Sequence, residues 1–422
     1  MRFYIYTLGC KVNTYESNVM RDKLLNAGYI EGNEDDSNIF IINTCTVTNT
    51  SDNKSLKTIR SVKRNHENSI IIVCGCMTQV NLELLNDLDI SIILGNSGKS
   101  KIVEYLEEYK KNNMPIKIID NIMEKEFEDM CLNNFNKTRA FVKIEDGCEN
   151  YCSYCIIPYA RGKVRSKKPD VVIDEIKKLV SDGHKEIVLT GIHTGHYGSD
   201  INYSFSKLLK KIENIEGLSR LRISSIEITE LDDEFLKVLK DSKILVDHMH
   251  IPLQSGSDEI LKLMNRKYDK NYFINKINEI RKIRPDMSVT TDIIVGFPGE
   301  NEELFNETID TVNKVRFSKI HVFPFSLRRG TKAEELPNHI DDITKKQRVK
   351  KLIGVSKELE IEYFNKFINK ETEYLPEIYK NGDVIGHSGN YLLVKCKGNI
   401  EDLNNIKKIK IEKVEYPYVI GK

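Results

Sequence analysis

Three cysteines, Cys148, Cys152 and Cys155, are separated by three and then by two residues. This spacing lets one tight loop present three thiolates, which can hold three corners of a cubane iron–sulfur cluster and leave the fourth iron open to a substrate. A structural zinc site needs four ligands, and electron-transfer ferredoxin clusters use four cysteines. Because no fourth Cys or His lies near this loop in the sequence, the spacing favours an open iron–sulfur site. Zinc with a distant fourth ligand and three merely structural cysteines are the alternatives.

A second set of three cysteines, Cys10, Cys45 and Cys76, is dispersed along the first part of the chain. Each of them directly follows an apolar run that predicts a β-strand. Parallel strands end at one edge of their sheet, which is where open α/β sheets bind ligands. We therefore expect the three thiols to meet and to form another three-cysteine site, with three unrelated buried cysteines as the alternative. Cys74 lies within the predicted strand, so we interpret it as a core residue.

Glycines and polar residues stand at the ends of later predicted strands, and Asp292 stands within one, in the region that begins with the Cys148 loop. Glycine lets the backbone approach a ligand closely, and polar side chains at strand ends can bind one. Ordinary turn and cap residues would give the same pattern. The candidates for contacts with a bound cofactor are Gly191, Ser224, Ser225, Glu227, Gln254 and Asp292.

Two basic groups flank the cysteine motifs. Lys54, Lys57 and Arg60 recur at three-residue spacing after Cys45 and share one face of a predicted helix. Arg161, Lys163 and Arg165 follow the Cys148 loop closely. Such runs are often only solvated faces. Because both groups flank cysteine motifs, we expect them to contact the phosphates of a nucleic acid.

The composition of the 422-residue chain is that of a multidomain globular protein, with 40% hydrophobic and 30% charged residues. The net charge of +1 excludes a histone-like polycation but not a local basic patch. Nine cysteines cannot all pair as disulfides. No apolar run approaches the roughly 18 residues of a membrane span, and the N-terminus reads as a strand instead of a signal peptide. We expect a cytoplasmic protein without a membrane partner.

The elements that position these residues are predicted to form three domains of α/β and β structure. Residues 1–112 alternate strands with helices, which indicates an open parallel sheet with helices on its faces. The strands are predicted at 2–8, 38–43, 69–74 and 91–94, and the helices at 15–27, 53–65, 79–85 and 99–110. A poorly patterned connector follows.

Residues 134–364 begin a second alternation, which predicts a partial (β/α)6 barrel. Its strands are predicted at 140–145, 186–190, 221–225, 248–252, 288–295 and 319–324. Its helices are predicted at 169–181, 204–212, 232–240, 269–283, 302–315 and 344–368. Residues 365–422 show short alternating runs separated by turn residues, which predict a small β-barrel of the kind that often binds RNA.

The sequence resembles known enzymes at these motifs. The spacing of Cys148, Cys152 and Cys155 is similar to that of the radical S-adenosylmethionine (SAM) superfamily. Segments 7–17, 43–47 and 75–79, which contain the other cysteine set, resemble the N-terminal domain of the methylthiotransferases in that superfamily. Further similar segments are 253–257, 264–268, 296–300 and 323–326. The C-terminal tail resembles the RNA-binding TRAM module, so the resemblance covers nearly the whole chain.

This resemblance implies two 4Fe–4S clusters and SAM as cofactors. Cys148, Cys152 and Cys155 would hold the cluster whose open iron binds SAM, and the other set would hold an auxiliary cluster that mediates sulfur insertion. In the family, one SAM donates a methyl group to sulfur at the auxiliary cluster. A second SAM gives an adenosyl radical that removes hydrogen from carbon 2 of an adenine, where the methylthio group is then inserted.

The run Cys10-Lys11-Val12-Asn13 resembles the branch that acts on threonylcarbamoyladenosine at position 37 of tRNA. The resemblance implies three partners: the tRNA anticodon loop, a low-potential electron donor and a sulfur source. The same chemistry on isopentenyladenosine or on a ribosomal protein is one alternative. A zinc-bearing RNA-binding module without enzyme activity is another.

Overall fold

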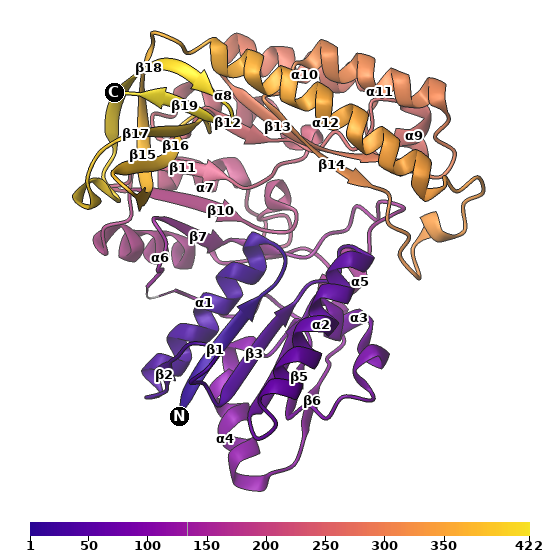
Figure 1. Cartoon of the computed structure of the whole chain (residues 1–422), viewed down its shortest axis with the longest axis vertical. Coiled ribbons are helices and arrows are strands. Elements are labelled where there is room, and N and C mark those ends of the chain that lie inside the picture. Colours follow the sequence, from indigo (N-terminus) through magenta and orange to yellow (C-terminus); the bar gives the residue numbers. More distant parts are fainter. Residues whose placement is uncertain (133) are drawn as a thin grey trace.

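The N-terminal domain of the computed structural model, which describes residues 1–132 and 134–422, is a parallel six-stranded sheet with the order β2-β1-β3-β4-β5-β6 (Figure 1). Its strands are β1 (Arg2–Thr7), β2 (Ile30–Glu31), β3 (Ile39–Thr44), β4 (Ile70–Gly75), β5 (Ile92–Leu94) and β6 (Ile116–Ile118). Its helices are α1 (Lys11–Asn26), α2 (Asn49–Asn65), α3 (Cys76–Val80) and α4 (Ile102–Asn112). Apolar side chains of α1 and α4 pack on one face of the sheet and those of α2 and α3 on the other. The sheet is therefore buried on both faces, as parallel sheets usually are.

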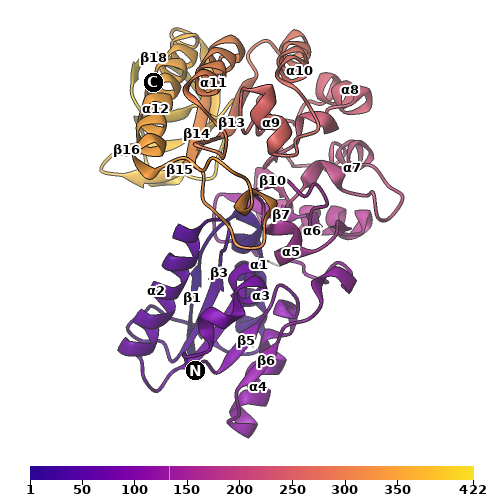
Figure 2. The ribbon, with the colours of Figure 1, turned by 90° about the vertical axis from the view of Figure 1, so that its right-hand side faces the viewer.

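The central domain is an open barrel of six parallel strands, and the largest apolar core lies between these strands and the outer helices (Figure 2). Its strands are β7 (Arg139–Lys143), β10 (Glu186–Thr190), β11 (Arg220–Ile223), β12 (His248–His250), β13 (Ser288–Val295) and β14 (Lys319–Pro324). Its outer helices are α6 (Pro169–Ser181), α7 (Phe205–Ile212), α8 (Asp233–Asp241), α10 (Lys270–Ile283), α11 (Glu302–Val315) and α12 (Asp342–Asn365). The strands form two three-stranded sheets, joined where Leu221 of β11 bridges Leu245. The six predicted strands are all present.

Shorter elements connect these units. They are the antiparallel pair β8 (Glu145–Asp146) and β9 (Arg165–Ser166), and the helices α5 (Ile157–Arg161) and α9 (Asp258–Leu263). The 3-10 helices are η1 (Leu82–Leu85), η2 (Lys99–Lys101), η3 (Ile122–Glu124), η4 (Thr194–His196), η5 (Ile228–Glu230), η6 (Lys332–Glu334) and η7 (Ile400–Asp402).

The C-terminal domain is a closed barrel with the order β15-β16-β17-β19-β18. Its strands are β15 (Glu371–Lys380), β16 (Asp383–Ser388), β17 (Leu393–Lys397), β18 (Lys407–Glu415) and β19 (Tyr418–Gly421). Tyr363, Phe364 and Phe367 at the end of α12 complete its core. The barrel lies beside β11 and β12, so it is packed on the central domain (Figure 1). Its likeness to a TRAM module stays a prediction.

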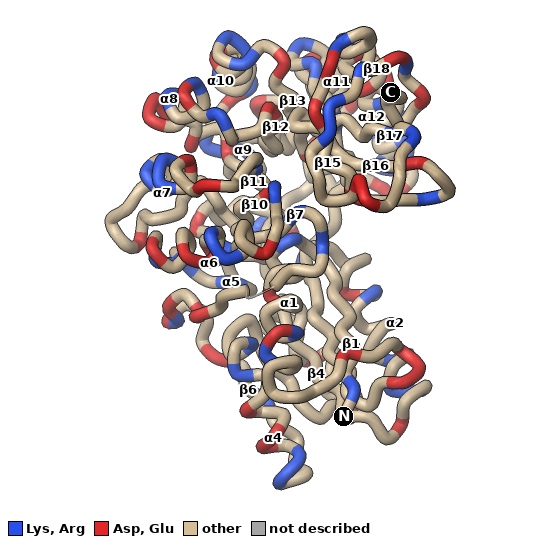
Figure 3. The backbone as a smooth tube through the Cα atoms, turned by 90° about the vertical axis from the view of Figure 1, so that its left-hand side faces the viewer, with Lys and Arg blue, Asp and Glu red and all other residues tan. Residues whose placement is uncertain are grey.

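The N-terminal domain also docks on the central barrel. Tyr15 and Val19 of α1 belong to the barrel's apolar core, and the Tyr15 hydroxyl donates to Glu175 of α6 at 2.8 Å. Basic and acidic positions are interspersed along all three domains, as the net charge of +1 leads one to expect (Figure 3). No helix among the described residues is long and apolar enough to cross a membrane.

The predicted and observed elements differ mainly at their ends. Helix α1 begins at Lys11 and α2 at Asn49, each four residues before the predicted start, because first turns that are mainly polar show no helical apolar pattern. The predicted helix 79–85 is instead α3 followed by η1, with Asn81 outside helical geometry between them. The short edge strands β2 and β6 were not predicted.

Candidate functional site

The Cys148 loop connects β8 to α5 and is held in shape by the backbone. Gly147 has φ +93°, and a Cβ there would lie 1.8 Å from the carbonyl oxygen of Lys163, so only glycine fits. The Cys148 amide donates to the Gly162 oxygen at 3.0 Å and the Cys155 amide to the Cys152 oxygen at 2.9 Å. These contacts bend the loop so that its three thiols share one space.

The thiols of this loop are free, and burial dominates their chemistry. Burial, together with the neighbouring Cys152, raises the pKa of Cys155 to about 12. Burial likewise raises the pKa of Cys148, with Cys155 and Cys152 adding to the effect. All three cysteines stand on this one short loop. Metal ions deprotonate such thiols on binding, so three converging thiols can hold a metal cluster.

Two side chains of the central barrel contact these thiols. Arg266 donates an N–H to the Cys152 sulfur at 3.2 Å, and its other end pairs with the carboxylate of Glu227. The Nδ1 atom of His193 lies 3.8 Å from the Cys148 sulfur. Glu227 was predicted as a cofactor contact, and the structure places it beside this loop. Arg266 and His193 carry no spacing pattern, so the sequence did not reveal their role.

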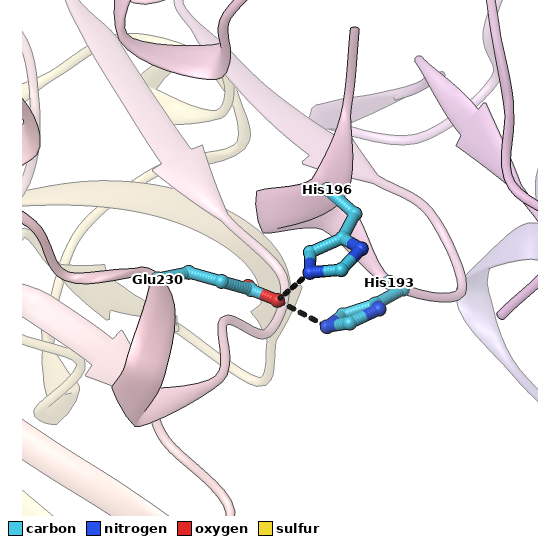
Figure 4. Close-up of side chains that lie close together, drawn as sticks. All are labelled: His193, His196 and Glu230. Atoms are coloured by element: carbon cyan, nitrogen blue, oxygen red, sulfur yellow. Dashed lines mark ion pairs between the residues drawn. The ribbon is translucent and has the colours of Figure 1, made fainter. Parts of the chain in front are cut away.

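His193 also belongs to a group with His196 and Glu230 (Figure 4). The two imidazoles are stacked with centroids 4.0 Å apart, and one Glu230 oxygen pairs with His193 and lies 3.5 Å from His196 Nε2. These atoms are of metal-ligand type. The contacts with Glu230 hold both rings in place, and we assign no metal to the group.

A cavity of about 210 Å³ opens beside Cys155, between the two larger domains. Gln254 and Asp292, two of the predicted cofactor contacts, line it together. Val47 and Thr48 of the N-terminal domain line its other side, and Ile294, Phe323 and Phe325 give it an apolar wall. A ligand on an open position of a cluster at Cys155 would therefore have room and polar partners.

The other predicted cofactor contacts do not line this cavity. Gly191 packs against Glu145, whose Oε2 would lie 2.7 Å from a Cβ at this position. Ser224 is buried and Ser225 half-buried after β11. Among the described residues, no hydrogen bond joins either serine side chain to the cysteine loop.

Cys10, Cys45 and Cys76 follow three adjacent parallel strands, β1, β3 and β4, and converge at one edge of the sheet as predicted. A Cβ on Gly9 would lie 2.9 Å from the Cys45 sulfur. Burial raises the pKa of Cys45 to about 11, with Cys76 and Cys10 adding to the effect. These three thiols also share one space. Cys74 is fully buried in the apolar core, as interpreted.

One asparagine ties two of the strand ends that carry this set. Asn13 of α1 donates from Nδ2 to the Leu8 oxygen at 2.7 Å and to the Thr44 oxygen at 2.9 Å. Its Oδ1 lies 3.8 Å from the Cys10 sulfur. The side chain therefore fixes the turns before Cys10 and Cys45 relative to each other.

A buried ion network surrounds Cys76. Arg161 donates from Nε to the Cys76 sulfur at 3.3 Å, and Asn96 donates to the same sulfur at 3.4 Å. Arg161 also pairs with Glu16 at 2.7 Å and with Asp146 at 3.2 Å. Burial alone would raise the pKa of Glu16, but Arg161 and other cations hold it well below its usual range.

The network contains more positive than negative charge. Its cations are Arg161, Arg165, Lys99 and Lys143, and its anions are Glu16 and Asp146. Buried charge needs a partner. An anionic group held by the three thiolates would supply one, so the residues present fit a second iron–sulfur cluster.

This network corrects two predictions. Arg161 is fully buried and Arg165 is 7% exposed, so neither side chain reaches tRNA phosphates. Their charges are used inside the protein, where they face carboxylates and, for Arg161, a thiol. Lys54, Lys57 and Arg60 are exposed on one face of α2, and Lys163 is also exposed. A phosphate-binding role for these four stays a prediction.

Comparison with known proteins covers nearly the whole chain. The model of the Radical SAM superfamily matches residues 142–312, and that of Uncharacterized protein family UPF0004 matches residues 2–95. The chain is 42% identical to the threonylcarbamoyladenosine tRNA methylthiotransferase MtaB of Bacillus subtilis, over 99% of this chain and 95% of that one. It is 35% identical to the tRNA-2-methylthio-N(6)-dimethylallyladenosine synthase of Natranaerobius thermophilus, over 97% and 94%.

A solved structure shares the fold of much of this chain. It is the radical S-adenosylmethionine methyltransferase TsrM from Kitasatospora setae, with a TM-score of 0.58 and 13% identity over 79% of this chain and 76% of that one. At this identity the likeness concerns the fold alone.

Proposed function

The chain belongs to the radical SAM methylthiotransferase family, and on that premise we propose that it inserts a methylthio group at carbon 2 of threonylcarbamoyladenosine at position 37 of tRNA. It is a radical SAM enzyme that modifies tRNA. The observation that carries the proposal is the presence of two converging sets of three free thiols, with a cavity between the domains beside one of them.

The residues of each set have separate tasks in this proposal. Cys148, Cys152 and Cys155 would hold the 4Fe–4S cluster that binds SAM, and Cys10, Cys45 and Cys76 would hold the auxiliary cluster. When bound, the cluster and SAM supply one-electron chemistry that activates an aromatic C–H bond with no useful acidity. The protein's own part is to position the cofactors and the base and to exclude competing reactions.

Several side chains orient the reactants. Gln254 and Asp292 face the cavity beside Cys155 and would contact SAM. Arg266 would donate a hydrogen bond to the Cys152 thiolate and so stabilise it. Lys54, Lys57 and Arg60 on α2 would bind phosphates of the anticodon stem–loop, whose unpaired adenine can be splayed into the cavity.

Other partners follow from the chemistry. One-electron cleavage of SAM needs a low-potential electron donor, and sulfur insertion needs a sulfur source. Both would act, with tRNA, in the cytoplasm. The relatives include enzymes named for threonylcarbamoyladenosine at 36–42% identity and enzymes named for dimethylallyladenosine at 34–35%. The higher identity supports the threonylcarbamoyl substrate.

Nucleoside analysis of tRNA from a strain that lacks the gene tests the proposal. We expect loss of 2-methylthio-threonylcarbamoyladenosine and retention of 2-methylthio-dimethylallyladenosine. Loss of 2-methylthio-dimethylallyladenosine alone would show that the substrate is the dimethylallyl-modified adenosine. Unchanged tRNA would support the alternative in which the substrate is a ribosomal protein. Stoichiometric zinc in anaerobically purified protein would support the alternative of an RNA-binding module without enzyme activity.

Cysteine variants expressed in that strain test which set of three cysteines serves SAM cleavage and which serves sulfur insertion. Replacing Cys148, Cys152 and Cys155 by Ala should abolish reductive cleavage of SAM. Replacing Cys10, Cys45 and Cys76 should leave cleavage measurable and stop formation of the methylthio product. Product formation by the second variant would contradict the assigned roles.

A further inference from the structure

The inner face of the central barrel is polar, although its outer face is apolar. Successive residues of a strand point to opposite faces. On β13, Val289 and Ile293 join the apolar core under the helices, whereas Thr290 and Asp292 alternate with them and contact histidines of β12. We call the inward-facing set the polar lumen. It consists of Arg139, Arg222, His248, His250, Thr290, Asp292, His321 and Tyr391.

Direct contacts connect the members of the polar lumen across three strands. The Thr290 hydroxyl lies 3.1 Å from His248 Nε2 and 3.0 Å from His250 Nδ1. His250 Nε2 lies 3.3 Å from an oxygen of Asp292, and the ring of His321 on β14 lies 5.8 Å from that of His250. Asp292 also lines the cavity beside Cys155, so the polar lumen and that cavity have a residue in common.

Tyr391 of the C-terminal barrel closes the far end of the polar lumen. Its ring stacks on His248 with centroids 4.4 Å apart, and the guanidinium carbons of Arg222 and Arg139 lie 4.8 and 5.6 Å from its centroid. Tyr391 has φ +68°, a left-handed conformation that costs free energy for a bulky residue. The fold therefore holds this aromatic ring in place against a local backbone preference.

Cations dominate this end of the barrel. Arg222 pairs with Glu186 at 2.7 Å, and Arg139 pairs with Glu377 at 3.1 Å. Lys11 begins α1, one turn before Tyr15, which packs in the apolar core of the barrel. Burial alone would raise the pKa of Tyr391, but the cations of Arg139 and Lys11 lower it. Lys11 is exposed and takes part in no ion pair among the described residues, so its ammonium is solvated and open to a ligand.

His248 shows an unmet hydrogen-bonding capacity at the same end. It is 7% exposed, and its Nδ1 atom has no hydrogen-bond partner among the described residues. A buried polar atom without a partner costs about 1–3 kcal/mol, and most such atoms in folded proteins are satisfied. An unpaired cation and an unpaired imidazole nitrogen together indicate a place for a polar, anionic group.

We propose that the polar lumen binds the N6 substituent of the target adenine and, with Lys11, selects a substituent that carries a carboxylate. The inference rests on the proposed function and adds how the substrate is recognised. A threonylcarbamoyl group offers a carboxylate, a hydroxyl and a urea. These groups match the cations and the unpaired nitrogen of His248.

The same surroundings reject the apolar alternative. A dimethylallyl group in the polar lumen would remove water from Lys11 and His248 and replace it with no hydrogen bond. Sites built to hydrogen-bond a substrate reject an analogue that lacks the polar group far more strongly than apolar pockets reject a small change of size. The polar lumen therefore separates the two classes of tRNA substrate by charge and hydrogen bonding.

Binding of three synthetic anticodon stem–loops tests this inference without turnover. Their adenine at position 37 carries threonylcarbamoyl, the same group with its carboxylate replaced by a neutral carboxamide, or dimethylallyl. Fluorescence anisotropy with cluster-reconstituted protein and no reductant measures each affinity. We expect the native protein to prefer the carboxylate over the carboxamide about ten- to hundredfold, the usual contribution of a hydrogen bond to a charged group.

Two variants and a matched control identify the residues responsible. Lys11→Gln and Tyr391→Phe should each reduce the preference for the carboxylate to within about twofold. Lys54→Gln on the exposed face of α2 should instead weaken all three stem–loops equally, because phosphate contacts carry no information about the base. Lys11 adjoins Cys10, so iron content is measured for that variant. Tyr391 belongs to the C-terminal barrel and keeps the test independent of cluster loading.

The outcomes separate this inference from the proposed function. Loss of the preference in both variants, with the preference kept in Lys54→Gln, supports the polar lumen as the selecting site. If the native protein prefers the carboxylate and both variants keep that preference, the inference is wrong and the proposed function stands. If the native protein prefers dimethylallyl or shows no preference, the proposed substrate is wrong and the inference falls with it.

Discussion

Arg161 is the residue that joins the two cysteine sets. It follows Cys155 by six positions in the chain, yet its guanidinium lies against Cys76 of the other domain and against Glu16 of α1. Asp146, which pairs with it, stands two residues before Cys148. One buried side chain therefore contacts the N-terminal set directly and holds the stem of the other cysteine loop.

Arg161→Lys should selectively weaken the auxiliary site. Lysine keeps the charge but cannot bond Cys76, Glu16 and Asp146 together, and loss of charge-assisted hydrogen bonds costs about 1.5–3 kcal/mol each. We expect iron at the Cys10 set to fall while SAM cleavage persists, as measured by iron analysis and Mössbauer spectroscopy. Arg165→Lys is the control, since Arg165 is also buried beside Asp146 but has no contact with Cys76. Equal iron loss in both variants would contradict this role.

Arg266→Gln should lower the reduction potential of the cluster at the Cys148 loop. The variant removes a positive charge and an N–H donor 3.2 Å from the Cys152 sulfur, and hydrogen bonds to cluster sulfurs favour the reduced state. Potentiometry followed by electron paramagnetic resonance, in the absence of tRNA, measures the shift. Lys267→Gln changes the exposed neighbouring residue and should leave the potential unchanged. A shift of the same size in both variants would exclude a specific effect of Arg266.

At the scale of elements, the strand-to-helix turns set where the cysteines lie. Gly75 ends β4 with φ +110°, and a Cβ there would lie 2.5 Å from the Thr44 oxygen. The turn places Cys76 as the first residue of α3. Three such turns after adjacent strands bring residues 31 and more positions apart in sequence to one edge of the sheet.

Gly75→Ala should destabilise the N-terminal domain and reduce its iron content. A left-handed conformation costs about 1–2 kcal/mol for a residue with a Cβ, and the contact with Thr44 adds to that cost. Thermal unfolding and iron analysis measure both effects. Gly28→Ala is a matched control, because Gly28 has φ +85° but nothing within 4 Å of the added Cβ. If Gly28→Ala lowered iron content as much, backbone strain alone would explain the result.

The basic face of α2 is an element-scale prediction about tRNA. Charge reversal of Lys57 and Arg60 to Glu should weaken binding and make the plot of log affinity against log salt shallower by about 0.7–0.9 for each lost phosphate contact. Cleavage of SAM without tRNA should not change. Lys237 and Lys240 on α8 have the same three-residue spacing and are also exposed, so their reversal is the control. Identical salt slopes for both pairs would show that the basic face of α2 does not bind tRNA phosphates.

Strand periodicity and the cysteine spacing predicted most of this architecture. The runs 186–190, 288–295 and 319–324 match β10, β13 and β14 at both ends, because apolar strands bounded by turn residues are clear in sequence. The convergence of Cys10, Cys45 and Cys76 followed from parallel topology alone. Helix starts were missed where polar first turns hide the pattern.

The electrostatic contacts could not be predicted from the sequence. Arg161 and Arg165 sit in a basic run that looks solvated, and only the docking of two domains buries them. His193 and Arg266 meet the cysteine loop from strand ends and turns more than 40 positions away in sequence. Such pairings depend on tertiary structure and leave no local periodicity.

At the scale of the whole molecule, the C-terminal barrel forms part of the central domain's interior. Arg222 donates to the Gly389 oxygen at 3.2 Å and to the Ser388 oxygen at 3.3 Å, and Tyr391 faces the polar lumen. The end of α12 contributes Phe364 and Phe367 to the small barrel's core. The two domains therefore share both an apolar and a polar boundary.

Truncation after Lys370 removes the C-terminal barrel and should open and destabilise the central barrel. The change exposes Tyr363, Phe364 and Phe367, each worth about 1.5–3 kcal/mol when buried, and removes the Ser388 and Gly389 oxygens that accept from Arg222. We expect a lower unfolding temperature, increased binding of a hydrophobic dye and loss of selectivity among the modified stem–loops. The full chain with Tyr391→Phe keeps the small barrel and should keep its stability. An unchanged unfolding temperature of the truncated protein would show that the C-terminal barrel does not stabilise the central domain.

The position of Arg161 also sets an order of events during synthesis. The ribosome completes Cys10, Cys45 and Cys76 before it reaches Arg161, which lies 85 residues beyond Cys76. At about 5–20 residues per second, the nascent chain carries three unshielded thiols for roughly 4–17 seconds. The auxiliary cluster can be stably inserted only after this interval, so its delivery to the N-terminal domain follows translation of the domain that comes next.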